Sequence, residues 1–143
     1  MTRLSLHLTV FSLILALLAG PALAQDVKAM VDRGMENCQN GRYDQALKDF
    51  NDALKLKPKD PTLITYRGVV YYAKGQNDLA MKEFNQALEI DPKFGKAHYQ
   101  RGMIYENQQK YSQAVDELKK AKSLGYYIDP VFIESVEKKA QKK

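Results

Sequence analysis

Apolar residues recur at intervals of three and four along most of the chain, which is the spacing of one face of an α-helix. Before Gly75, the residues Ile64, Gly68 and Tyr71 mark such a face. After Gly75, a second face consists of small and large apolar residues, namely Ala80, Met81, Phe84, Ala87 and Leu88. The pattern therefore predicts two consecutive amphipathic helices.

Residues that begin or end helices stand at the edges of these two patterns. Asp60 precedes Pro61, and an acidic N-cap followed by proline in the first turn is a typical helix start. Gly75 supplies the left-handed conformation that ends the first helix, and Pro92 prevents the second from continuing. We therefore expect one helix-turn-helix unit over residues 61–94.

The same arrangement occurs three times, with a period of 34 residues. The units are 27–60, 61–94 and 95–128. Equivalent positions hold the same small or basic residues: Gly34, Gly68 and Gly102; Ala46, Ala80 and Ala114; Ala53, Ala87 and Ala121; Arg33, Arg67 and Arg101. A fixed period of this size indicates a solenoid, in which each unit buries its apolar face against the next.

These units resemble tetratricopeptide repeats. The second unit matches the small and large positions of that family throughout, at Gly68, Tyr71, Ala80, Phe84, Ala87 and Pro92. The other units depart from the pattern at Asn37, where an aromatic residue is usual, at Leu118, and at Tyr126 in place of the proline. The resemblance implies an all-α fold: three helix-turn-helix repeats in a short right-handed solenoid over residues 25–128.

The departure at Tyr126 predicts where the solenoid ends. We expect Gly125 to terminate a helix and Asp129-Pro130 to start a last one. Residues 129–143 then form a capping helix with a lysine-rich tail, because a solenoid needs a terminal element with a polar outer face. A truncated fourth repeat is the alternative interpretation.

Residues 1–24 have the order of features found in secretory signal peptides. Arg3 precedes an apolar run, and Ala22-Leu23-Ala24 provides small residues at a cleavage site. The run is shorter than the ~20 residues that span a bilayer. We expect cleavage before Gln25 and export to the periplasm or the exterior, with an uncleaved membrane anchor as the alternative.

No group of residues in the sequence indicates catalysis, a metal site or a cofactor. Residues 25–143 contain one histidine, His98, and one cysteine, Cys38, whereas a structural metal site needs about four ligands. We expect His98 to be packed and the arginine column to contact a neighbouring carboxylate or carbonyl group. We also expect Cys38 to be inert, since no adjacent residue would lower its pKa. The chain is accordingly predicted not to be an enzyme.

The charge of the chain limits the classes of partner that we expect. The formal net charge is +5. Several lysines lie at the C-terminus, where their positive charges interact favourably with the negative end of the helix dipole. A nucleic-acid surface would need a basic stripe with interleaved aromatic residues. We therefore expect no nucleic-acid partner, and membrane contact that is at most peripheral.

In tetratricopeptide proteins the first helix of each unit lines a concave surface that receives a peptide or a helix. Steps of three and four residues place twelve positions on this surface, which we call the inner face: Lys28, Val31, Met35, Cys38, Thr62, Thr65, Val69, Tyr72, Lys96, Tyr99, Met103 and Glu106. The predicted partner-binding residues among them are Val31, Met35, Thr65, Val69, Tyr72, Tyr99, Met103 and Glu106.

The inner face is more apolar than an ordinary solvent surface, and exposed apolar patches usually mark interaction sites. Val31 and Met35 replace the polar groups with which one subclass of the family grips a terminal carboxylate. The sequence thus predicts a protein-protein interaction scaffold that binds an apolar peptide or partner helix. The alternatives are a structural protein that self-associates through its repeat ends and, more weakly, a thiol-dependent partner acting through Cys38.

Overall fold

The computed structural model describes residues 23–142, which fold into seven helices without strands. The first helix covers residues 23–39 of the described part. It is followed by α2 (Tyr43–Leu56), α3 (Pro61–Ala73), α4 (Asn77–Ile90), α5 (Gly95–Asn107), α6 (Tyr111–Ser123) and α7 (Pro130–Gln141). The all-α prediction is confirmed.

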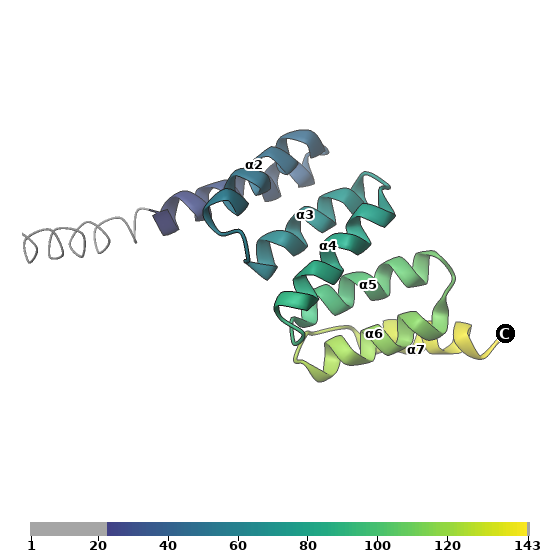
Figure 1. Ribbon diagram of the computed structural model, residues 1–143. Helices are drawn as coiled ribbons and strands as arrows, with labels where there is room; N and C mark the ends of the chain where they lie inside the picture. Colours follow the sequence, from purple (N-terminus) through teal and green to yellow (C-terminus); the bar gives the residue numbers. More distant parts are fainter. Residues whose placement is uncertain (1–22, 143) are drawn as a thin grey trace, which may run out of the picture.

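The helices form antiparallel pairs that stack in chain order (Figure 1). Each helix from α2 to α7 packs against its neighbours in the sequence, and α3 also contacts α5. The first helices of consecutive units therefore form one layer and the second helices another, as in a solenoid. The row ends at α7, which packs on α6.

Two acidic residues cap helices as the sequence predicts. The carboxylate of Asp60 accepts hydrogen bonds from the backbone N–H groups of Thr62 and Leu63 at the start of α3. The carboxylate of Asp129 accepts one from Val131 at the start of α7. Both helices have proline in the first turn. Each cap satisfies backbone donors that a helix N-terminus leaves without intrahelical partners.

The turn inside each unit uses a left-handed residue at the same position of the repeat. Gly41 has φ 71° and Gly75 has φ 76°. The third unit has Gln109 there, with φ 59°, in a conformation that side-chain-bearing residues seldom adopt. The shared backbone geometry shows that the period of 34 residues extends to the turns.

Small residues allow the two helices of a unit to approach closely. The alanines of both repeated columns, including Ala46, Ala80 and Ala87, are fully buried. Phe50 and Phe84 are also fully buried, and each ring lies against the glycine of its own unit. The core thus consists of repeated contacts between small and large residues.

Helix α7 closes the C-terminal end of the solenoid. Ile133 and Val136 are buried and pack with Ala114, Leu118 and Ala121 of α6. This confirms the predicted capping helix. The predicted signal peptide, residues 1–24, lies outside the described residues except at its last two positions. Among the described residues, no helix combines the length and apolar character needed to cross a bilayer.

Candidate functional site

The predicted partner-binding residues come from the first helix, α3 and α5. Seven of the eight are half-buried, and Thr65 is fully buried. Thr65 therefore offers no surface to a partner, and its hydroxyl oxygen has no hydrogen-bond partner in the described structure. Apart from Thr65, the predicted partner-binding side chains are packed but keep part of their surface exposed.

In the first unit, the inner-face residues pack toward α3. Val31, Met35 and Cys38 contact the cluster of Ala46, Phe50 and Val70. Burial raises the pKa of the Cys38 thiol, which disfavours the reactive thiolate. The structure thus supports the expectation that Cys38 is a packing residue.

In the second unit, Val69 and Tyr72 pack against the cluster that contains Phe84 and Ile104. Ile104 belongs to α5, so these two side chains connect α3 to the next unit. They have a structural role, and the exposed remainder of each side chain is what a ligand would contact.

In the third unit, two of the predicted residues are engaged by the C-terminal part of the chain. The ring of Tyr99 lies 5.0 Å from the ring of Tyr126, measured between centroids. The carboxylate of Glu106 accepts a hydrogen bond of 2.6 Å from the Lys139 ammonium of α7. Glu106 is therefore paired within the protein. Met103 is half-buried and belongs to none of the core clusters of the described residues.

Lys96 is an inner-face residue that the sequence analysis did not select for binding. Its ammonium lies over the ring of Tyr66, 4.1 Å from the centroid. Burial lowers the pKa of Lys96, and no salt bridge to this lysine occurs among the described residues. A partly desolvated cation without a carboxylate attracts an anionic group more strongly than an ordinary surface lysine does.

Tyr126 belongs to the same aromatic environment. Burial raises the pKa of Tyr126, and Tyr99 and Tyr66 contribute to the shift. Tyr66, Lys96, Tyr99 and Tyr126 thus come from α3, α5 and the segment before α7. We call these four residues the tyrosine–lysine cluster. The departure from the family pattern at Tyr126 is what brings the last ring there.

A second constellation consists of the repeated arginines. Arg67 of α3 donates hydrogen bonds through Nε and Nη2 to Glu83 of α4, and through Nη1 to Asn51 of α2 at 2.8 Å. Arg101 donates through Nη2 to Glu117 and through Nη1, at 2.9 Å, to Asn85. Each arginine therefore connects three helices, and the predicted contact with neighbouring carboxylates is confirmed.

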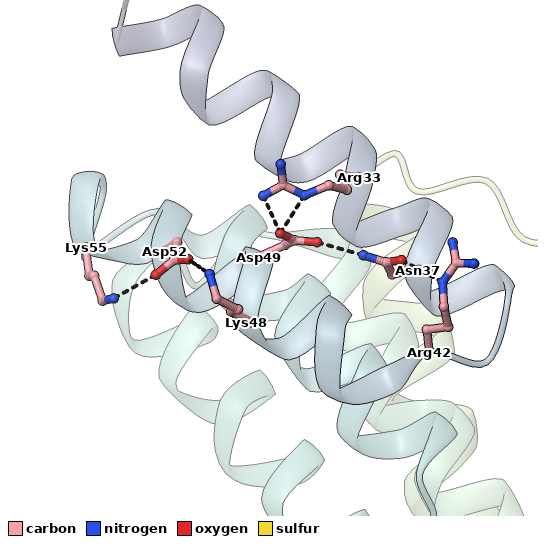
Figure 2. A network of polar contacts seen from close by, with 7 residues as sticks. All are labelled: Arg33, Asn37, Arg42, Lys48, Asp49, Asp52 and Lys55. Carbon is pink, nitrogen blue, oxygen red and sulfur yellow. Dashed lines mark hydrogen bonds and ion pairs between the residues drawn. The ribbon is translucent and has the colours of Figure 1, made fainter.

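The first unit builds this contact differently, as Figure 2 shows. Asp49 accepts hydrogen bonds from Arg33 on one oxygen and from the Asn37 amide on the other. Nε of Arg42 donates to the side-chain carboxamide oxygen of Asn37 at 2.9 Å. Asn37 is buried where the other units have tyrosine, so a polar network replaces the aromatic ring. The column of Asp49, Glu83 and Glu117 was the sequence signal for this network.

His98 is packed, as expected. Its two ring nitrogens lie 2.8 Å from a carboxylate oxygen of Glu117 and 3.1 Å from the carbonyl oxygen of Pro92. In the part of the chain that the structure describes, no group of three or more acidic, histidine or cysteine side chains is placed to hold a metal ion.

Comparison with solved structures shows the same fold in several proteins. The first TPR domain of Spaghetti (RPAP3), bound to the HSP90 peptide SRMEEVD, is 21% identical, with a TM-score of 0.69 over 82% of this chain and 92% of that chain. The Arabidopsis OM64 TPR domain is 21% identical, with a TM-score of 0.71 over 84% and 98%. The TPR2B domain of yeast Sti1, in a complex with pHsp70, is 19% identical, with a TM-score of 0.70 over 82% and 98%.

Family models give the remaining comparison. No curated protein sequence matches the chain. The model described as TPR repeat matches residues 34–75 and 68–109, and the model described as tetratricopeptide repeat matches residues 95–124. The TPR repeat matches alone cover more than half of the chain. The chain therefore belongs to the tetratricopeptide repeat family.

Proposed function

We propose that this protein binds a segment of another protein along its inner face and has no catalytic role. The tyrosine–lysine cluster is the observation that carries the proposal. Lys96 presents a partly desolvated ammonium over the ring of Tyr66, and it has no salt bridge among the described residues. Tyrosine provides a large contact surface with a polar tip. The cluster suits a ligand that carries an acidic group next to apolar side chains.

This proposal modifies the expected ligand. The sequence predicted an apolar segment, since Val31 and Met35 occupy the polar positions of a carboxylate-gripping inner face. The first unit keeps that apolar character, with both side chains half-buried on the Phe50 cluster. The acidic group of the ligand is assigned to the third unit, at Lys96. Two of the solved structures with this fold are named as complexes, one with an HSP90 peptide and one with pHsp70, which agrees with a protein or peptide ligand.

Selection from a random peptide library displayed on phage tests the proposal. The purified protein should enrich peptides with one acidic residue beside apolar residues. Lys96→Gln should abolish that acidic preference, whereas Lys93→Gln, at an exposed lysine in the preceding loop, should leave it unchanged. Enrichment without acidic residues, or identical sequences from the two variants, would refute the role of Lys96.

A second selection tests two tyrosines of the inner face. Tyr72→Ala and Tyr99→Ala should each reduce peptide capture, provided that the helical circular dichroism spectrum is retained. Full capture by both folded variants would show that the ligand does not lie on the inner face.

We further propose that the protein acts after export, in the periplasm or outside the cell. The support is the order of charged, apolar and small residues in residues 1–24. Mass spectrometry of the protein from cell fractions should find a chain that begins at Gln25. A cytoplasmic chain that retains its first 24 residues would contradict the proposal.

Self-association through the repeat ends has less support. Helix α7 covers the second helix of the last unit, and Lys119 of α6 is paired with Glu137 of α7 at 2.7 Å. A stacked copy would therefore have to displace α7 or use its outer face. Sedimentation at several protein concentrations distinguishes this alternative from a monomer.

A further inference from the structure

Arg33, the first arginine of the column, hydrogen-bonds to fewer side chains than Arg67 and Arg101 do. Nη1 of Arg67 and Nη1 of Arg101 donate to asparagine carbonyl oxygens of the preceding second helix. Arg33 uses Nε and Nη2 for Asp49, and its third nitrogen makes no hydrogen bond with the residues drawn in Figure 2, nor with any other described residue. Its side chain is 58% exposed, against 20% for Arg67 and 22% for Arg101.

Two residues close to Arg33 are also more exposed to solvent than their equivalents in the later units. Ala29 is exposed, whereas the equivalent residues Leu63 and Ala97 are buried against the preceding unit. Met30 is half-buried, whereas the equivalent Ile64 is fully buried. Ala29, Met30 and Arg33 define what we call the N-terminal face. The N-terminal face is the part of the first helix that corresponds to the surface of α3 buried against α2 and to the surface of α5 buried against α4.

The two interior interfaces specify what fits such a face. The covering helices α2 and α4 share the pattern Asn-x-Ala-Leu, at residues 51–54 and 85–88. The asparagine accepts the arginine Nη1 hydrogen bond, and the buried Ala53 and Leu54 pack with Leu63 and Ile64 of α3. An occupant of the N-terminal face therefore needs a carboxamide or carboxylate oxygen followed by a small and a branched apolar residue.

This chain does not supply that occupant at the repeat spacing. The residue 34 positions before Asn51 is Leu17, which has no side-chain acceptor. The residue 34 positions after Asn85 is Lys119, whose ammonium would repel Arg33 in a head-to-tail stack and which is already paired with Glu137. Neither of these two positions of the chain therefore offers the side-chain oxygen that the N-terminal face requires.

We propose that the N-terminal face is a second docking surface, which binds an α-helix of another protein carrying the pattern Asn-x-Ala-Leu. Docking continues the interior repeat interface by one helix. Arg33 donates through Nη1 to the carboxamide oxygen, and the small and branched residues cover Ala29 and Met30. This surface lies at the end of the solenoid and is distinct from the inner face.

A peptide with the sequence of α4, Asn77–Ile90, is a suitable probe because it carries the pattern. Its exposed Asp78 and Lys82, four residues apart, can be joined by a lactam that keeps the isolated peptide helical. The probe is titrated into the isotope-labelled protein, and backbone amide and Arg33 Nε–Hε resonances are followed. We expect saturable shift changes confined to residues 26–37.

Two matched controls make the test specific. A peptide with Asn85→Lys, the residue that the third unit has, should bind about tenfold more weakly, since it removes one hydrogen bond to a charged group. Ala29→Arg in the protein should weaken binding similarly, whereas Ala73→Arg, at an exposed alanine of α3, should not.

Three outcomes of the peptide titration would overturn the proposal: no saturable shifts, shifts at the inner-face residues of α3 and α5, or equal binding of the two peptides. Shifts of residues 26–37 that appear on raising the protein concentration without peptide would make a second copy the occupant, which also overturns it. Because the inner-face ligand is selected separately, failure here leaves the proposed function intact.

Discussion

A Cβ atom added to Gly68 of α3 would lie 2.5 Å from Cε1 of Phe84 on α4. The same relationship, sixteen residues apart, joins Gly34 to Phe50 at 2.9 Å and Gly102 to Leu118 at 3.1 Å. In each unit a large side chain thus occupies the space that the missing methyl group leaves. The distance between the two helices of a unit is set by this pair.

Gly68→Ala should therefore destabilise the protein, by about 1–3 kcal/mol, because the aromatic ring and the helix backbone must shift to admit the methyl group. Gly102→Ala is the matched control. It makes the same change against a flexible leucine, and alanine is favoured over glycine in a helix by about 1 kcal/mol. Urea unfolding followed by circular dichroism gives both free energies. Equal effects at the two positions would contradict the role assigned to Phe84.

Much of the fold could be predicted because it depends on local sequence. Helices begin at Asp60-Pro61 and at Asp129-Pro130, as the sequence predicts. Gly75 and Gly125 follow the ends of helices and have positive φ angles. Caps and left-handed turns need only the few residues around them. The arginine contacts were predictable in kind, since a basic column and an acidic column recur with one period.

The candidate site was less predictable because the exposed fraction of a side chain depends on how units stack. Thr65 shares a repeat position with Val31 and Tyr99, yet it alone is fully buried. Glu106 pairs with Lys139, a residue outside the repeats. Spacing within one helix identifies the face of a residue, but it does not identify what the next unit places over it.

Val136→Ala tests the capping helix. Val136 is fully buried against α6, so removing two methyl groups should lower the free energy of unfolding by about 2 kcal/mol. Val131→Ala is the same substitution on the same helix at a residue that is 69% exposed, and it should have little effect. Thermal or urea unfolding measures both. A neutral Val136→Ala variant would mean that α7 contributes little to stability.

The acid titration of Asp52 gives a pH-dependent prediction. Hydrogen bonds from Lys48 and from Lys55 lower the pKa of Asp52 from 3.8 to about 2 (Figure 2). A carboxylate whose pKa is lower in the folded state favours folding above pH 3.8, and that contribution is lost as the pH falls through about 2. Carbon-detected NMR of the Asp52 carboxylate should give the low midpoint.

The double variant Lys48→Ala, Lys55→Ala supplies the control for that titration. Without the two donors, the midpoint of Asp52 should rise toward 3.8. Lys57→Ala, at an exposed lysine just beyond α2, should leave the midpoint unchanged. A midpoint that stays low in the double variant would show that other groups hold the carboxylate ionised.

The reactivity of Cys38 distinguishes a packing residue from a thiol with a chemical role. Burial raises the pKa of this thiol above 9.0, so that little thiolate forms near neutral pH. Alkylation by iodoacetamide at pH 7.5 should then be at least about tenfold slower for the folded protein than for the protein in urea, since the thiolate is the nucleophile. Mass spectrometry over time gives both rates. Equal rates would place Cys38 on an accessible surface and restore the thiol-dependent alternative.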